Sequence, residues 1–288
     1  MKTVAIVSAV GGAGRTTLTA ALAGLLAARS HTALAIECDP RNVLALHFGL
    51  RESAREGLIT HLYDPGASGD GWASAALESD DGVLVLPWGS TTGQTGQASN
   101  GFDADDDGDG SARLDANRRW LRDLLGRVDL PSNAIALIDA APWPSAHARQ
   151  AIEAADLVLG VLTPDAAACA TLPRFTEALV RAGKRTAFIA NAVVPARQLH
   201  TDLIAMLRAR LGAAMLPYLV HADTGVPNAF ASGSNFCRGA PGSQAAHDMN
   251  GIASWISHWS TGALAELQSD LPEGARPAPP DRSTGGRR

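Results

Sequence analysis

Lysine is nearly absent from this sequence of 288 residues, since Lys2 and Lys184 are the two lysines among 24 basic residues. Cysteine is also rare, and the three cysteines lie far apart in the chain and form no C-x-x-C pair. This spacing argues against an iron–sulfur cluster and fits a reducing compartment. The eight histidines show no H-x-x-x-H spacing, so we expect no zinc site.

Long hydrophobic runs are missing too. No apolar run reaches the roughly 20 residues that span a bilayer, and Met1 is followed by a strand-like stretch rather than by a charged leader. We therefore expect a cytoplasmic protein without membrane insertion. The formal net charge is -5 and the basic residues are scattered, so we expect no direct binding to nucleic acid.

A glycine-rich loop is the most informative stretch that is present. An apolar run at residues 4–7 precedes it and a helical pattern of leucines follows it, which predicts strand, loop and helix. The candidate binding residues are Gly11, Gly12, Ala13, Gly14, Arg15, Thr16 and Thr17. Such a loop can surround a phosphate with backbone N–H groups at a helix N-terminus. ATP or ADP is the candidate ligand, and a purely structural turn is the alternative.

The loop departs from the P-loop pattern G-x-x-x-x-G-K-[ST] at two positions. Ala9 stands in place of the first glycine and Arg15 in place of the lysine. A guanidinium is broad and planar, whereas the lysine ammonium is a compact charge that sits on the β- and γ-phosphates. Arg15 therefore leaves hydrolysis open, and it is equally explained by a composition that avoids lysine throughout.

Polar residues also follow later apolar runs. The strand expected at residues 32–36 leads into Asp39, the strand expected at 134–138 ends in Asp139, and Asn191 follows another strand. The carboxyl ends of parallel strands form the ligand edge of an open sheet. Asp139 therefore suits Mg²⁺ in the manner of a Walker B carboxylate, although a helix cap is the alternative. Asn191 suits a base contact or a plain turn.

Strand-like and helix-like segments alternate along most of the chain, which predicts an α/β fold with a mainly parallel, doubly wound sheet between two helical layers. One nucleotide-binding domain is expected at residues 1–271. An acidic, low-complexity insert at about 90–112 and a Pro/Gly/Arg tail at 272–288 are expected to be disordered. Helices are expected at 114–128 and 264–271.

The order of the P-loop, Glu37-Cys38-Asp39-Pro40, Asp139-Ala140-Ala141-Pro142 and Asn191 resembles the MinD/ParA class of deviant Walker A ATPases over about residues 1–260. The resemblance implies a SIMIBI-type three-layer sandwich and a nucleotide-dependent homodimer. In that class a second lysine reaches across the dimer. Val10 stands at its position here, so that contact is absent.

The same resemblance implies roles for single residues. Arg15 would contact phosphate, Thr16 and Asp139 would hold Mg²⁺, Asp39 would be the switch I carboxylate that orients water, and Asn191 would contact adenine.

The BcsQ (YhjQ) branch of this class, found in bacterial cellulose synthase operons, is especially similar, because of the degenerate P-loop and the segments at 40–48, 86–89 and 216–221. It implies an accessory factor that regulates or localises the cellulose synthase complex, with weak or absent hydrolysis. Its partners would be synthase subunits and small operon proteins that recruit it to the inner membrane. The alternative is an active ParA/MinD-type ATPase that positions another cargo. A metabolic kinase or ligase would need a second polar pocket that the sequence does not reveal.

Overall fold

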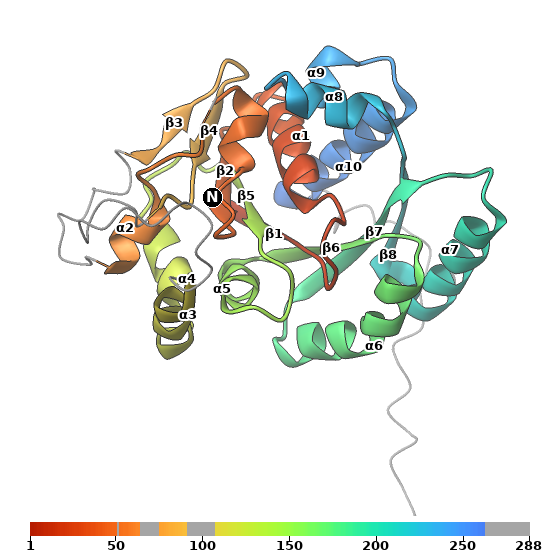
Figure 1. Ribbon diagram of the computed structural model, residues 1–288, viewed down its shortest axis with the longest axis horizontal. Coiled ribbons are helices and arrows are strands. Elements are labelled where there is room, and N and C mark those ends of the chain that lie inside the picture. The colour runs from red at the N-terminus through yellow and green to blue at the C-terminus, as the bar shows by residue number, and fades with distance from the viewer. Residues whose placement is uncertain (51, 64–74, 91–106, 263–288) are drawn as a thin grey trace, which may run out of the picture.

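The computed structural model describes residues 1–50, 52–63, 75–90 and 107–262. Eight strands form one sheet in the order β3-β4-β2-β5-β1-β6-β7-β8 (Figure 1). Their bounds are β1 Lys2–Val7, β2 Ala33–Cys38, β3 Leu77–Glu78, β4 Val83–Leu86, β5 Ile135–Ala140, β6 Leu157–Leu162, β7 Arg185–Val193 and β8 Met215–His221. All neighbouring strands are parallel except β3 and β4. The expected mainly parallel α/β sheet is confirmed.

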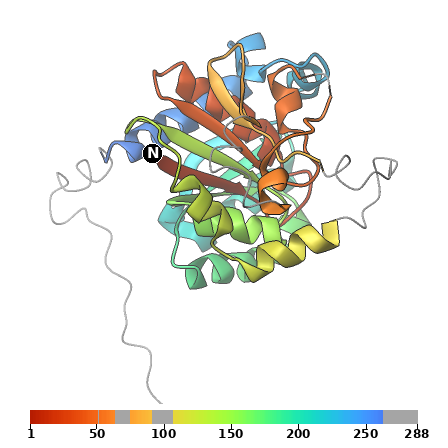
Figure 2. The same ribbon diagram turned by 90° about the vertical axis from the view of Figure 1, so that its left-hand side faces the viewer.

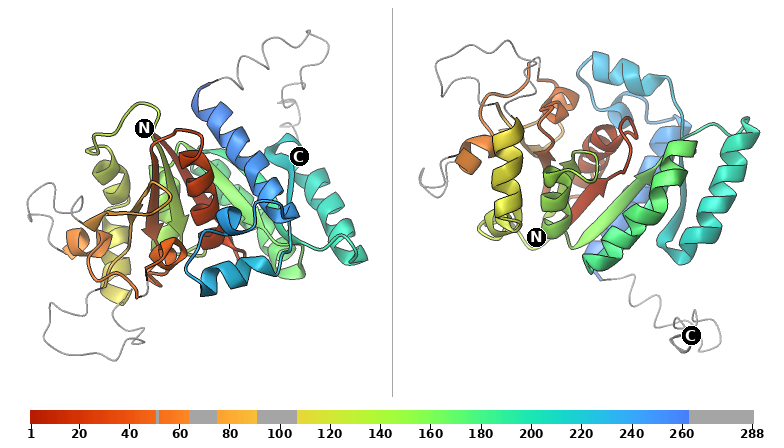
Figure 3. Two further views of the ribbon diagram at one scale, coloured as in Figure 1. Left: turned by 90° about the horizontal axis from the view of Figure 1, so that it is seen from above. Right: turned by 60° about the horizontal axis from the view of Figure 1, so that its bottom comes forward.

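Helices cover both faces of the sheet, which explains why every residue of β2, β5 and β6 is buried. One face carries α1 Arg15–Ala27, η1 Leu44–Phe48, α8 Gly225–Ala231, α9 Phe236–Gly239 and α10 Gln244–Ser260 (Figure 3, left). The other face carries α2 Leu58–Tyr63, α3 Asp107–Ala116, α4 Trp120–Leu125, α5 Ala146–Ala154, α6 Ala166–Arg181 and α7 Gln198–Leu211, and the short helix η4 Gly212–Ala214 follows α7 (Figure 2; Figure 3, right). None of the described helices is both long and apolar enough to cross a bilayer.

The region around the acidic insert differs from the sequence prediction. Residues 107–111, expected to be part of a loop, are helical in α3, and the single helix expected at 114–128 is divided into α3 and α4. The amide of Gln150 in α5 explains the division, because it donates to the carbonyl oxygens of Leu114 at 2.7 Å and Asn117 at 2.6 Å. Residues 91–106 of the insert, the helix expected at 264–271 and the tail lie outside the described residues.

Three central strands bring the candidate residues to one edge of the sheet. Asp139 on β5 is in register with Ile6 on β1 and with Glu37 on β2. Beyond the strands, the N–H of Ala141 donates to the carbonyl of Cys38 at 3.0 Å, and the N–H of Trp143 donates to the carbonyl of Ser8 at 2.9 Å. The loops that follow β1, β2 and β5 are therefore fixed side by side.

Candidate functional site

The P-loop, residues 9–17, joins β1 to α1 by two left-handed glycines. Gly12 has φ 71° and Gly14, the N-cap of α1, has φ 88° and supplies no side-chain cap. Within the described part of the chain, the backbone N–H groups of residues 11–17 have no hydrogen-bond acceptor. A Cβ placed on Gly11 or Gly12 would meet no atom within 4 Å. Unpaired N–H groups facing open space at a helix start suit an anion.

The guanidinium of Arg15 is buried behind this loop. Its Nη2 lies 3.9 Å from Oδ2 of Asp39, whereas Nε and Nη1 have no hydrogen-bond partner among the described residues. Burial lowers the pKa of Arg15, and the negative charges of Asp139 and Asp39 act against that shift. Buried donors without acceptors are costly. The two free nitrogens therefore fit a ligand that brings its own oxygen atoms.

Asp139 is the counterpart of Arg15, because both of its carboxylate oxygens are buried without a hydrogen-bond partner in the described residues. Burial raises the pKa of Asp139 to about 7. The nearby hydroxyl of Thr16 acts in the opposite direction and lowers this pKa, although its position does not meet the geometry of a hydrogen bond. An unpartnered buried carboxylate beside a threonine hydroxyl fits a cation.

The donor set fits Mg²⁺ better than a transition metal. Among the described residues, no three His, Cys, Asp or Glu side chains converge in a way that could hold a metal ion by themselves. Mg²⁺ commonly takes one or two protein ligands and completes its shell with phosphate and water. Thr16 and Asp139 match that requirement, provided that a phosphate is bound.

Asp39 lies beside Arg15 but is held by a residue that the sequence reasoning missed. Arg41 donates to Oδ1 through its backbone N at 3.1 Å and its Nε at 3.0 Å, and to Oδ2 through Nε at 3.1 Å and Nη2 at 2.6 Å. The Asp39 side chain is 2% exposed and that of Arg41 is 52% exposed. A basic residue two positions after the strand-end Asp was the available signal for this contact.

Glu37 anchors the segment that follows Asp39. This buried carboxylate accepts the N–H groups of Val43 at 2.5 Å and Leu44 at 2.9 Å through Oε1. Burial, followed by the nearby charge of Asp139, raises the pKa of Glu37 to about 8. The sequence pattern does not indicate this role of Glu37, because the loop that it holds is defined only by the fold.

Asn191 contacts the P-loop instead of standing free at the sheet edge. Its Nδ2 donates to the carbonyl of Ala13 at 2.7 Å, and the next residue, Ala192, has φ 57°. A Cβ on Gly14 would collide with the Asn191 amide. Asn191 therefore supports the loop across the sheet edge, and the adenine contact implied by the resemblance stays a prediction.

Solved structures share this fold. The septum site-determining protein MinD of Pyrococcus horikoshii OT3, complexed with Mg-ADP, aligns with a TM-score of 0.69 and 18% identity over 94% of this chain and 99% of that chain. Cobyrinic acid a,c-diamide synthase of Mycobacterium smegmatis, with bound ADP and magnesium, aligns with a TM-score of 0.70 and 15% identity over 91% of this chain and 96% of that chain. These likenesses identify a MinD/ParA-type P-loop NTPase fold.

Sequence comparison is more specific. The chain is 28% identical over 247 residues to the cellulose biosynthesis protein BcsQ of Salmonella typhimurium strain LT2, covering 85% of this chain and 90% of that protein. The family described as "Cellulose biosynthesis protein BcsQ" matches residues 1–256. With the altered P-loop, the strand-end carboxylates and the parallel sheet all in place, the chain belongs to the BcsQ family.

Proposed function

We propose that this protein binds ATP or ADP with Mg²⁺ at the P-loop. We also propose that it serves bacterial cellulose biosynthesis as an accessory factor that regulates or localises the synthase complex. The proposal of nucleotide binding rests on one observation: the site holds both N–H donors and carboxylate oxygens that have no partner among the described residues. The N–H groups of residues 11–17 and the buried nitrogens of Arg15 need acceptors, and the buried oxygens of Asp139 need a cation.

Different residues of the site would bind different parts of the ligand. The loop N–H groups and Arg15 would bind phosphate oxygens, and Thr16 and Asp139 would hold Mg²⁺, whose charge neutralises the phosphates. Asn191 would keep the loop in shape from β7. The half-buried Val10 brings no cation to the site, and Arg15 is a broader group than lysine. We therefore expect slow turnover.

Direct titration tests nucleotide binding. Isothermal titration with ATP and ADP, with and without Mg²⁺, should give binding that depends on Mg²⁺ and is lost in Gly14→Val, because the added side chain would strain a left-handed residue and collide with Asn191. Gly183→Val is the matched control, since Gly183 also has a positive φ, 64°, but an added Cβ there would meet no atom within 4 Å. If the wild type fails to bind either nucleotide in the presence of Mg²⁺, the proposal is wrong.

Partner recovery tests the cellulose role. Affinity capture from the native host with the wild type, Gly14→Val and Gly183→Val should recover cellulose synthase subunits and small operon partners in a way that depends on the P-loop. Equal recovery with all three proteins would separate partner binding from nucleotide binding. Sedimentation with and without ATP would test the expected nucleotide-dependent homodimer.

A second candidate is an active ParA/MinD-type ATPase that positions another cargo. It is favoured by the buried Asp39, a carboxylate at the site that could orient water. It requires phosphate release that falls strongly in Asp39→Ala. Release that is unchanged by this substitution would eliminate the candidate.

A further inference from the structure

The Asp39 carboxylate is held by Arg41 at both oxygens, and its side chain is only 2% exposed. A carboxylate offers about four lone-pair sites, and three N–H groups of Arg41 donate to the two oxygens of Asp39, with the single Nε–H shared between both oxygens. Two of these donors, Nε and Nη2, belong to the side chain, and the third is the backbone N–H. A water molecule that approaches this buried carboxylate must therefore displace a charge-assisted hydrogen bond of the guanidinium.

The backbone around Arg41 is fixed by other contacts. Glu37 holds the N–H groups of Val43 and Leu44. Asn42 donates to the carbonyl of Ala54 at 2.6 Å and accepts from the N–H of Gly89 at 3.1 Å. The guanidinium of Arg41, by contrast, is half exposed. The side chain can therefore leave Asp39 by rotation while the segment that carries it stays in place.

We propose that Arg41 is a positioning residue whose guanidinium holds Asp39 and prevents hydrolysis until it rotates away from that carboxylate. We call this contact the latch. The inference rests on the proposed binding of ATP and explains why turnover is slow. It concerns one ligand, a nucleoside triphosphate with Mg²⁺.

The controlled step is ordinary phosphoryl transfer to water. The water oxygen forms a bond to the γ-phosphorus, the bond from that phosphorus to the β,γ-bridging oxygen breaks, ADP leaves with the electron pair, and the water proton passes to the released phosphate. Asp39 orients the water only while at least one of its oxygens is free. The fraction of molecules with Arg41 turned away therefore scales the rate constant kcat without setting ATP affinity.

Steady-state phosphate release, paired with equilibrium ATP titration, tests the latch on the full chain with Mg²⁺. Arg41→Ala should raise kcat about tenfold or more, because charge-assisted bidentate pairs are strong. ATP affinity should change by less than about threefold, since a latch acts on the step after binding. Arg41→Lys should lie between wild type and Arg41→Ala, because one ammonium cannot hold both oxygens. The double variant Arg41→Ala/Asp39→Asn should lose the gain.

Arg149→Ala is the matched control. Arg149 on α5 makes an equally bidentate pair with Asp115 outside the site, and its loss should leave kcat unchanged. A kcat that stays equal or falls in Arg41→Ala and Arg41→Lys, while both still bind ATP, overturns the latch. So does a gain that persists without Asp39. If the wild type binds no ATP, the proposed function itself fails and the latch has no reaction to control.

Discussion

Three buried carboxylates and two guanidinium groups share the loop edge of the sheet. Asp39 is paired with Arg41, whereas Asp139 and Glu37 are buried on neighbouring strands, where burial raises the pKa of both carboxyls and the charge of Asp139 raises that of Glu37 further. A buried carboxylate that keeps its proton avoids the cost of an unpaired charge. The buried carboxylates of this edge therefore favour the binding of added positive charge.

Glu37 should make the protein less stable as the pH rises. The pKa of this carboxyl is raised from 4.5 to about 8 in the folded chain. The folded state holds a proton that the unfolded state has released, so the contribution to stability is full below pH 4.5 and is lost as the pH rises toward 8. Glu37→Gln keeps an oxygen for Val43 and Leu44 and carries no charge. We expect it to raise the free energy of unfolding at pH 7.5 by roughly 1–3 kcal/mol.

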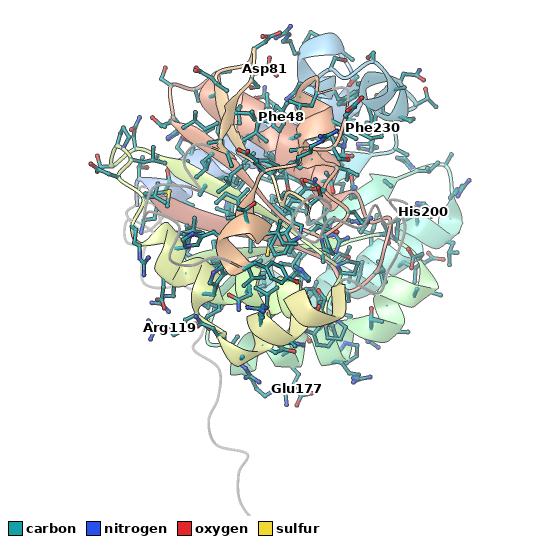
Figure 4. The ribbon with its side chains drawn as sticks, turned by 60° about the vertical axis from the view of Figure 1, so that its left-hand side comes forward. Phe48, Asp81, Arg119, Glu177, His200 and Phe230 are labelled. Carbon is teal, nitrogen blue, oxygen red and sulfur yellow. The ribbon has the colours of Figure 1, made fainter. Side chains whose placement is uncertain are left out.

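Urea unfolding at pH 5 and pH 7.5 checks this expectation, because the gain from Glu37→Gln should shrink at the lower pH. Glu177→Gln serves as the control, since Glu177 lies on the outer surface of α6 (Figure 4) and its side chain is 64% exposed. An equal gain at both pH values would show that Glu37 is ionised in the folded protein, contrary to the prediction.

At the scale of elements, α3, α4 and α5 depend on one side chain. Gln150 of α5 accepts the N–H of Leu121 in α4 at 3.1 Å and donates to the carbonyls of Leu114 and Asn117. Leu at position 150 would leave the buried N–H of Leu121 and the buried carbonyl of Leu114 without these partners. We expect Gln150→Leu to lower the free energy of unfolding by roughly 2–4 kcal/mol in urea denaturation. Gln198→Leu, at an exposed position on α7, should change it little, and equal effects would refute the role given to Gln150.

The link between β7 and the P-loop belongs to the same scale. Asn191→Ala removes the hydrogen bond to Ala13 and frees the loop on one side. We expect ATP affinity to fall roughly tenfold, the equivalent of one hydrogen bond of about 1.4 kcal/mol. Asn133→Ala is the control, because Asn133 makes the same kind of bond to the carbonyl of Ser30 on the surface. Unchanged ATP affinity in Asn191→Ala would remove the supporting role.

Several elements were predictable because their signals are local. The glycine-rich loop lies between β1 and α1, as the apolar run before it and the leucines after it predict. The helix α5 was missed because it is short and follows Pro142 and Pro144. Ser145, which caps it by accepting the N–H of Ala148, was the signal that could have revealed it.

At the scale of the whole molecule, ligand binding should raise the free energy of unfolding. A ligand that binds only the folded chain at 100 times its dissociation constant adds about 2.7 kcal/mol, which for a domain of this size corresponds to a rise in melting temperature of roughly 5 °C or more. We expect this rise with ATP and Mg²⁺ in a thermal unfolding scan of the wild type and of Gly183→Val. Gly14→Val should show no rise. A rise of the same size in Gly14→Val would place the nucleotide elsewhere.

The sequence alone determined the fold class and the place of the glycine-rich loop, and it pointed to Asp39, Asp139 and Arg15 as candidate site residues, because strand period, glycine conformation and motif order act over short stretches of chain. Tertiary structure decided which groups meet. Asn191 reaches Ala13 across 178 positions, and Arg15 lies buried beside two carboxylates that enter on separate strands. Arg41 is only two residues from Asp39, but the backbone that follows it is fixed by Glu37, which accepts the N–H of Val43, and by Asn42, which donates to Ala54. Contacts of this kind depend on how distant segments pack, which no local pattern encodes.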